Sequence, residues 1–393
     1  MDITAILRFL VFFWLGAPIV IFGLYGIVLL FYGKSDKNYP QKGLAYDEIK
    51  KFEPYVSVVI PTHNEESIIS KRIENLLISS YPLEKLEIIF VDDSNDSTPV
   101  IIEDYSKRFP CIRLIRFSER MGYSPSLIAG CEAAKGEIVV LAEASSFLEA
   151  DTIERLISNF RDPSIGTVSG KDVLLNLNED IGQSEGMYLK ILDFVRKAES
   201  NMDSTIYMKG EAAAVRKDLI RDLKELDGCP GTADTAIALF VRSKGYRFIF
   251  DPQAKFHEYA PSTRSGRVHQ KVIRGANLIK VLWRFRGMFL KRKYGKFGMI
   301  VLPFNLAMLA FVPISLLAGI LSLILLTFFE PAFSLIIWMV IGSFLLFGML
   351  YSKQMVITSL EFEYSLLKAF YEIVFVRKTH DKIDKVASTR RSS

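Results

Sequence analysis

The sequence is poor in cysteine, and its cysteines form no recognisable site. Cys111, Cys131 and Cys229 show neither a C-x-x-C pair nor the spacing of a zinc site. Because disulfides persist in oxidising compartments, this usage favours a reducing compartment, with the three thiols as core residues. The sequence also lacks G-x-G-x-x-G after a strand, G-x-x-x-x-G-K-[ST] and H-E-x-x-H. It therefore offers no support for a dinucleotide-binding, P-loop or zincin protein.

Acidic residues are missing from one long stretch. Residues 264–296 contain eleven lysines or arginines and no aspartate or glutamate, and an apolar run follows directly. This pattern favours an anionic membrane surface or a phosphate-bearing ligand as the partner. Nucleic acid is not expected as a partner.

Charge is missing altogether from three apolar runs. Residues 9–32, 299–329 and 331–351 contain no charged side chain, and each run can cross a hydrocarbon core of roughly 30 Å. The first run is longer than the apolar part of a signal peptide and lacks a small-x-small cleavage site, so a retained anchor is predicted. A mean hydropathy of +0.23 agrees with a membrane protein.

The basic residues around these runs predict an orientation. Lys34, Lys37 and Lys42 follow the first run, and the tail after the last run is also basic. The positive-inside rule places both segments in the cytoplasm, which requires one span before the soluble domain and an even number after it. Three spans satisfy this requirement. We expect an integral membrane protein, in a prokaryotic plasma membrane, whose soluble domain is cytosolic.

These patterns divide the chain into consecutive segments. They are a transmembrane anchor (1–33), a linker (34–54), a soluble domain (55–263), a basic amphipathic segment (264–298), two transmembrane helices (299–351), and a further amphipathic helix with a basic tail (352–393). Apolar side chains at helical spacing give both amphipathic segments an apolar stripe. Examples are Leu278 and Val281 in the first segment and Leu360 and Tyr364 in the second. Helices of this kind are expected at the membrane interface.

The soluble domain alternates strands and helices. Strands are predicted at 56–60, 86–91, 112–116, 138–141, 165–168, 206–208 and 248–250, and helices at 99–108, 125–134, 151–160, 182–198 and 233–243. The last strand is expected to end at Asp251-Pro252. Such alternation implies crossover connections. The expected class is therefore α/β, with a mainly parallel sheet and helices on both faces.

Polar residues follow the first two strands. The chain reads PTHNEE at 61–66 and VDDSND at 91–96. Because ligands of open parallel sheets bind outside the carboxyl ends of the strands, both clusters are predicted to face one crevice. Asp and Ser in the second cluster are also common turn and helix N-cap residues.

These motifs make the soluble part resemble a membrane-bound family 2 inverting glycosyltransferase, which has the Rossmann-like GT-A fold. PTHNEE is similar to the family's P-x-x-N-E, and VDDSND to its V-D-D-x-S-x-D. The resemblance covers about residues 55–275. It implies that Asp93 binds an N–H of uracil or of another base. Pro61, Thr62 and Glu65 would line the nucleoside pocket.

The family's metal-binding Asp-x-Asp is not present. Residues 136–153 resemble the stretch that carries it, but Glu143-Ala144-Ser145 stands in its place. In the family, Mg²⁺ or Mn²⁺ at this motif neutralises the leaving diphosphate. The resemblance implies Glu143 as a metal ligand, with Ser145 and His257 as further ligands, and the lower charge predicts weak binding. For His257, as a lone histidine, a structural role is favoured over that of a ligand.

Two later positions also match the family. Asp234, in CPGTADTAIAL, falls on the catalytic carboxylate, which acts as the base that inversion requires; an aspartate near a helix start can also be an N-cap. In HQKVIRG, Lys271 and Arg274 fall where polymer-making relatives carry Q-x-x-R-W, with Gly275 in place of the tryptophan. Arg274 would hold the diphosphate, and Lys271 would add a charge.

The leading hypothesis is a metal-assisted, inverting transfer of a sugar, expected to come from a UDP-sugar. A lipid-linked acceptor is expected at the cytosolic membrane face, of polyprenyl phosphate, glycolipid or diacylglycerol type. One alternative is a processive polysaccharide synthase, which the three spans and Gly275 disfavour. Another is a non-catalytic membrane protein that retains the fold, which Glu143-Ala144-Ser145 favours and the retained Asp93 and Asp234 disfavour.

Overall fold

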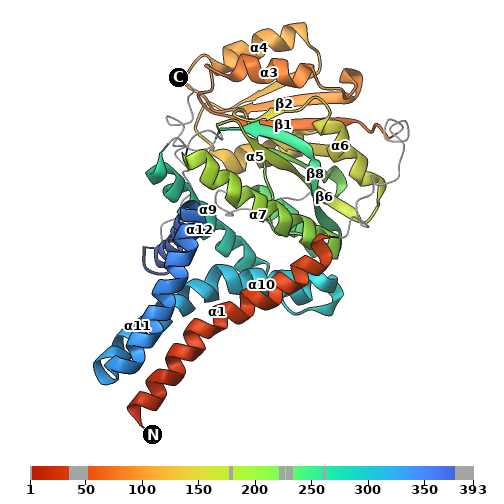
Figure 1. The fold of residues 1–393 in the computed structure, drawn as a ribbon. Coiled ribbons are helices and arrows are strands. Elements are labelled where there is room, and N and C mark those ends of the chain that lie inside the picture. Colours follow the sequence, from red (N-terminus) through yellow and green to blue (C-terminus); the bar gives the residue numbers. More distant parts are fainter. Residues whose placement is uncertain are drawn as a thin grey trace.

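The computed structural model describes residues 2–34, 52–176, 180–220, 226, 233–259 and 263–376. An α/β domain lies at one end, and long helices project from it (Figure 1). Most of the predicted linker, Cys229 and the basic tail from residue 377 lie outside the described residues. Of the other two cysteines, Cys131 is buried and Cys111 is half-buried.

Within the described residues, the α/β domain contains a sheet of eight strands in the order β3-β2-β1-β4-β7-β6-β8-β5. They are β1 (Val56–Thr62), β2 (Leu86–Asp92), β3 (Ile112–Arg116), β4 (Ile138–Ala142), β5 (Phe147–Leu148), β6 (Ile165–Leu174), β7 (Ala212–Arg216) and β8 (Arg247–Glu258). Strands β1 to β4 pair in parallel, as do β6 and β8, whereas β5 and β7 are antiparallel to their neighbours. The predicted mainly parallel sheet is confirmed.

Helices cover both faces of this sheet (Figure 1). They are α3 (Ile69–Leu77), α4 (Thr98–Arg108), α5 (Tyr123–Ala133), α6 (Thr152–Ser158), α7 (Asp180–Met202) and α8 (Ala233–Ser243), with short 3₁₀ turns at Leu83–Lys85, Asn159–Arg161 and Lys217–Ile220. On one face Ile73 of α3 packs in a cluster with Val58 of β1. On the other, Leu127 of α5 packs in a cluster with Val59. Since β1 and β2 are buried on both faces, they read as continuous apolar runs.

The second half of the sheet differs from the prediction. Residues 206–208 are not a strand, and the strand that follows them is β7, whose alanine-rich sequence has little β propensity. Strand β8 does not end at Asp251-Pro252. Its pairing with β6 passes from Phe250 opposite Ser169 to Lys255 opposite Lys171, so Pro252 lies in an irregularity that needs no ladder hydrogen bond.

Among the described residues, three helices are long and apolar enough to cross a membrane, at the positions that the sequence predicts. They are α1 (Ile3–Gly33), the continuous helix Phe297–Phe329, and α12 (Pro331–Tyr371). The middle helix contains α10 (Leu302–Leu306) and α11 (Val312–Phe329), with π-helical turns at Phe297–Val301 and Ala307–Phe311. Far from the α/β domain, Nε and Nη2 of Arg8 in α1 each donate a 2.8 Å hydrogen bond to Glu330, which lies between α11 and α12.

Helix α12 is broken at Ser352, which has non-helical φ and ψ of −157° and 93°. The predicted span ends just before this residue, and the predicted amphipathic segment begins with it. After the break, Ser365 and Ala369 are buried, whereas Leu360 and Tyr364 are 55% and 56% exposed. The segment therefore has one face against protein and one exposed apolar face, as an interfacial helix requires.

The basic segment forms α9 (Arg264–Arg284), followed by 3₁₀ turns at Arg286–Met288 and Arg292–Tyr294. Val281 and Leu282 are fully buried in the domain core, so part of the stripe predicted to face headgroups packs against protein. Arg267 of α9 forms a 2.5 Å ion pair with Glu361 of α12. Helix α9 therefore attaches the α/β domain to the part of α12 after the break.

A buried carboxylate joins the domain to the other membrane helices. Glu199 of α7 is fully buried and accepts hydrogen bonds from Tyr25 Oη of α1 at 2.5 Å and from Asn305 Nδ2 of α10 at 2.7 Å. Its other oxygen accepts from Thr205 Oγ1 at 2.6 Å. Burying a carboxylate is costly unless donors compensate for the lost water. These three donors therefore hold α1, α7 and α10 in one arrangement.

Removing one of these donors should destabilise the protein. In Asn305→Ala, Glu199 loses a hydrogen bond, which should cost about 1–3 kcal/mol and lower the melting temperature in detergent by about 2–4 °C per kcal/mol. Ser322→Ala is the matched control, because Ser322 Oγ bonds only to the Ala318 carbonyl of its own helix. Equal melting temperatures for the two variants would contradict a joining role for Glu199.

Candidate functional site

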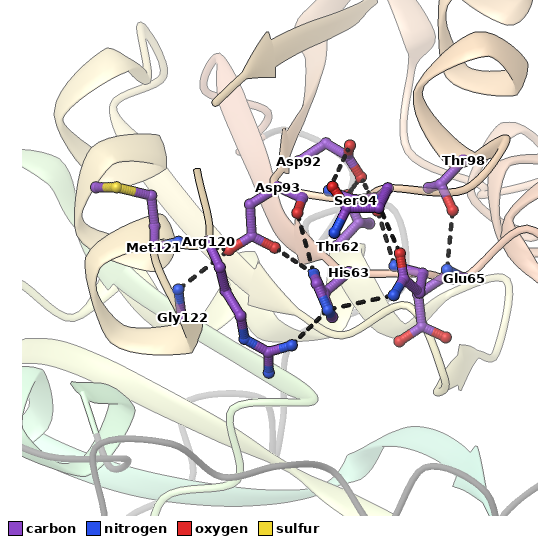
Figure 2. Close-up of polar contacts among 12 residues, drawn as sticks. Thr62, His63, Glu65, Asp92, Asp93, Ser94, Thr98, Arg120, Met121 and Gly122 are labelled. Carbon is purple, nitrogen blue, oxygen red and sulfur yellow. Dashed lines mark hydrogen bonds and ion pairs between the residues drawn. The ribbon is translucent and has the colours of Figure 1, made fainter. Parts of the chain in front are cut away.

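The site begins at the loops that follow β1 and β2. Thr62 Oγ1 and Ser94 Oγ donate hydrogen bonds of 2.6 and 2.7 Å to the same oxygen of Asp92. Ser94 Oγ also accepts the backbone N–H of Asn64 at 2.8 Å. The two polar clusters therefore lie together (Figure 2). Asp92 is fully buried, so it organises the loops and is not available to a ligand.

The residues predicted to line a nucleoside pocket differ in their exposure. Pro61 and Thr62 belong to β1 and are buried, so they shape the end of the strand. Glu65 is 9% exposed, and its backbone N–H donates to Thr98 Oγ1 at 2.8 Å. Its carboxylate points away from Thr98 (Figure 2). Of these three residues, only Glu65 presents a polar side-chain group beyond the strand.

Asp93 holds a third loop in place. One carboxylate oxygen accepts the N–H groups of Met121 and Gly122 at 2.8 and 3.0 Å, and the other lies 2.8 Å from His63 Nδ1. Gly122 has φ of 86°, a conformation that favours glycine and lets two successive N–H groups reach the carboxylate. The Asp93 side chain is 3% exposed. Since a carboxylate offers about four lone-pair positions, these contacts occupy three of them.

Two residues in the neighbourhood of Asp93, His63 and Arg120, were not predicted from the sequence as site residues. His63 is bonded to Asp93 through Nδ1, and its Nε2 contacts the guanidinium of Arg120 (Figure 2). Because Nδ1 faces a carboxylate and Nε2 faces a donor, these partners assign the proton of a neutral imidazole to Nδ1. His63 and Arg120 thus form one edge of the candidate nucleoside pocket.

Tyr123, the first residue of α5, connects this region to the predicted base. A Cβ on Gly210 would lie 2.8 Å from Tyr123 Oη and 2.9 Å from Asp234 Oδ2. Both side chains therefore converge on the backbone of Gly210, where only glycine leaves room for them. Asp234 is the second residue of α8, so it lies in the first turn. Tyr123 and Gly210 were not predicted from the sequence, because Tyr123, Gly210 and Asp234 come together from segments that are far apart in the chain.

Two further carboxylates lie near Asp234 because β7 is antiparallel to β4. Ala142, at the end of β4, pairs with Ala212, at the start of β7. Glu143 follows the first of these residues and Glu211 precedes the second, so the two carboxylates leave the same edge of the sheet. Glu143 was predicted from the sequence. Glu211 was not, since no local pattern marks it and β7 itself was missed.

The surroundings of Asp234 raise its pKa to about 7. Burial is the main cause, because it disfavours the charged form, and the negative charges of Glu211 and Glu143 act in the same direction. A backbone hydrogen bond from Thr235 and the charge of Arg274 act in the opposite direction. A carboxylate with a pKa near neutrality is well suited to act as a general base.

The two predicted cations of α9 have different surroundings. Arg274 Nη2 lies 3.8 Å from Glu211 Oε1, so Arg274 joins the carboxylates around Asp234. Lys271 Nζ lies 3.3 Å from Glu185 Oε2 of α7 and 4.6 Å from the ring centre of Tyr188. The geometry therefore brings Arg274, but not Lys271, to the carboxylates.

The predicted metal ligands do not form a protein-only metal site. His257 Nε2 lies 3.2 Å from Glu149 Oε1, and Glu143 and Ser145 follow β4. In the part of the chain that the structure describes, no group of three or more His, Cys, Asp or Glu could hold a metal ion. Mg²⁺ sites often combine one or two carboxylates with substrate phosphates, and Glu143 fits a site of that kind.

Comparisons with known proteins agree with this arrangement. The family model described as Glycosyl transferase family 2 matches residues 57–223. A probable glycosyltransferase, YdaM, from Bacillus subtilis is 26% identical over 270 residues, which are 67% of this chain and 63% of the relative. A poly-beta-1,6-N-acetyl-D-glucosamine synthase from Staphylococcus aureus is 24% identical over 253 residues, 64% of this chain and 60% of the relative. The chain thus spans less than two thirds of the length of these relatives.

One solved structure resembles nearly the whole chain. The mannosyltransferase PcManGT from Pyrobaculum calidifontis, in complex with GDP-Man and Mn²⁺, has a TM-score of 0.73 and 23% identity. The match covers 95% of this chain and 99% of that protein, and it therefore includes the long helices. Residues 57–223 therefore match the Glycosyl transferase family 2 domain, and the chain shares the fold of this mannosyltransferase.

Because Tyr123 and Asp234 lie so close to Gly210, a larger residue at this position should lower the activity. In Gly210→Ala the new methyl group would displace Asp234 or Tyr123, and a shift of about 1 Å at a reacting group can cost about 100-fold in rate. Gly287→Ala is the control, since a Cβ there meets nothing within 4 Å. Release of nucleotide from nucleotide sugars should fall only in the first variant, with its melting temperature largely retained. Equal rates would show that Gly210 does not set the position of Asp234.

Proposed function

We propose that the protein is an inverting glycosyltransferase that moves a sugar from a nucleotide-sugar donor to a lipid-linked acceptor. The observation that carries this proposal is the position of Asp234, between the loops around Asp93 and the membrane-attached helix α9. We further propose a plasma membrane location, with the α/β domain on the cytosolic side.

The donor's nucleoside would lie against the loops after β1 and β2. The remaining lone pair of Asp93 would accept a base N–H, and Glu65, His63 and Arg120 would complete the pocket. A UDP-sugar is proposed as the donor; GDP-Man, which the similar mannosyltransferase binds, is the alternative. The two differ in the hydrogen-bonding edge of the base, so a comparison of UDP and GDP binding decides between them.

The diphosphate would lie between Glu143 and Arg274. Arg274 has a planar guanidinium that can donate two parallel hydrogen bonds to phosphate oxygens. We propose Mg²⁺ or Mn²⁺ on Glu143, with Ser145 as a weak additional ligand and the remaining positions left to the donor. His257 is bonded to Glu149. Donor binding would have to move it away from Glu149 before it served as a metal ligand. The bound cation would neutralise the leaving diphosphate.

Asp234 would act as the base. The acceptor oxygen attacks the anomeric carbon on the face opposite the diphosphate, and Asp234 takes its proton as the new bond forms. The bond between the anomeric carbon and the phosphate oxygen breaks, and its electron pair leaves with the nucleoside diphosphate. Arg274 faces the charge that develops on the leaving group.

Two elements around the site support a lipid-linked acceptor. Helix α9 carries Arg274 and packs on α12, and α7 is joined to α1 through Glu199. Helix α7 also exposes Met187, Ile191 and Phe194, which share one helical face. An exposed apolar stripe beside membrane helices is suited to contact with lipid.

A processive polysaccharide synthase is the second candidate. The similarity to the poly-beta-1,6-N-acetyl-D-glucosamine synthase favours it. The packing of Gly275 argues against it, since a Cβ there would lie 3.3 Å from Leu366 of α12. Position 275 therefore leaves no room for a tryptophan that stacks on a sugar. A ladder of long glycans would support the synthase, and a product with a single added sugar would support the leading proposal.

Replacing the base should remove turnover without removing donor binding. Asp234→Asn keeps the size of the side chain but cannot accept the proton, so the rate should fall about 100- to 10,000-fold. Nucleotide binding, measured by calorimetry, should stay within the wild-type range because Asp93 and Arg274 are untouched. Turnover close to that of the wild type would rule out Asp234 as the base.

The raised pKa of Asp234 predicts a pH profile. Below pH of about 7 the carboxylate is protonated and cannot act as a base, so kcat/KM should rise tenfold per pH unit there and level off above it. Glu211→Gln removes a negative charge that raises the pKa of Asp234. The rise of kcat/KM in this variant should therefore occur at lower pH. Glu84→Gln, on an exposed turn remote from the site, is the control. A profile that does not move in Glu211→Gln would contradict the assignment.

A further inference from the structure

An open groove lies between the start of α9 and the part of α12 that follows the break at Ser352. These two helices lie side by side (Figure 1). The groove has a volume of about 560 Å³, and ligand pockets have volumes of roughly 300–1,000 Å³. Its lining residues are Arg264, Ser265, Val268 and His269 of α9 and Lys368 of α12.

The groove lies on a different face of α9 from the candidate site. The four lining residues of α9 follow one another at spacings of one, three and one, so they share one face of the helix. Lys271 and Arg274 lie on another face and point toward Glu185 of α7 and Glu211. The basic segment therefore divides its cations between two places, and a bound donor would account for only one of them.

The positive charge of the groove is not neutralised by the protein. Among the described residues, no acidic side chain lines it, and the exposed Lys368 and His269 form neither an ion pair nor a hydrogen bond there. The side chain of Arg264 is 66% exposed, and its Nε contacts Glu361. Arg267 shares this carboxylate, so a single negative charge faces two guanidinium groups. The groove therefore has the electrostatics of an anion site.

The surroundings of the groove place it at the membrane surface. Lys368 follows the exposed residues Leu360 and Tyr364 at spacings of eight and four, so all three lie on one face of α12. An apolar helix face of this kind is suited to the interface between headgroups and acyl chains. The long stem of a lysine on such a face lets its ammonium group reach the headgroups. Val268 adds apolar surface to the same groove.

We propose that this groove binds the phosphate group of an anionic membrane phospholipid, such as phosphatidylglycerol. Lys368 and Arg264 bind the phosphate oxygens, His269 is a further donor, and the glycerol part of the lipid lies against Val268. The bound lipid holds the start of α9 against the second part of α12. It is not the acceptor of the proposed transfer, so this inference goes beyond the proposed function.

The charge of the groove selects among phospholipids. The phosphate of phosphatidylcholine carries its own quaternary ammonium group, which the cations of the groove repel. The headgroup of phosphatidylglycerol has a net negative charge and no cation. An anionic lipid should therefore bind more tightly than a zwitterionic one that has the same acyl chains.

The lipid class is tested with the full chain in a neutral detergent. Melting temperatures are measured with increasing dioleoylphosphatidylglycerol, with dioleoylphosphatidylcholine, or with inorganic phosphate. Because a ligand of the native state stabilises it by mass action, phosphatidylglycerol should raise the melting temperature in a saturable way, and the other two should not. Equal effects of the two lipids would overturn the proposal, as would an equal effect of inorganic phosphate. No donor is present, so the result is independent of sugar transfer.

A pair of variants on α12 tests the groove itself. Lys368→Gln should weaken the apparent affinity for phosphatidylglycerol about fivefold, which corresponds to about 1 kcal/mol for one basic side chain. Lys353→Gln is the matched control, because Lys353 is exposed after the same break and does not line the groove. Its affinity should stay within about twofold of the wild type.

The melting temperatures in phosphatidylcholine show whether both variants fold, and they should be close to that of the wild type because both lysines are exposed. An equal loss of affinity in the two variants would show that the basic surface attracts anionic lipid as a whole. In that case the groove would not be a lipid site.

Discussion

The burial of Glu199 is the constraint on which the arrangement of the molecule depends. A carboxylate without access to water must find its compensation within the protein, and here the donors come from α1, from the segment after α7, and from α10. These elements can therefore pack in only one way. Because α7 also carries Glu185, which lies 3.3 Å from Lys271 of α9, the same hydrogen bonds also help to position α7 against α9.

A second constraint is the accumulation of negative charge at the site. Glu143 and Glu211 leave adjacent ends of antiparallel strands, and Asp234 packs nearby on Gly210. Burial, together with the negative charges of Glu211 and Glu143, raises the pKa of Asp234 to about 7. Arg274 offsets part of this charge. Burial and these neighbouring charges thus explain how an aspartate becomes suited to the proposed role of base.

The sequence predicted those residues of the candidate site that belong to local motifs, and their roles remain predictions. The polar residues after β1 and β2, with Glu143, Asp234 and Arg274, are identifiable from the sequence alone, because each lies in a recognisable stretch. Tyr123 and Glu211 were missed, since each becomes part of the site only through segments far away in the chain. Asp93 was identified, but its three hydrogen bonds to the protein were not, because the loop of Met121 and Gly122 carries no motif.

By itself the sequence determined the three candidate membrane spans, the alternation of strands and helices, and the family motifs at the strand ends. All of these follow from periodicity and composition within short windows. Only the tertiary structure decided the antiparallel insertion of β7, the irregular pairing around Pro252, and the packing of α9 on α12. The reason is physical: strand register and helix contacts depend on which distant surfaces fit together, and a local pattern of apolar residues is compatible with several such pairings.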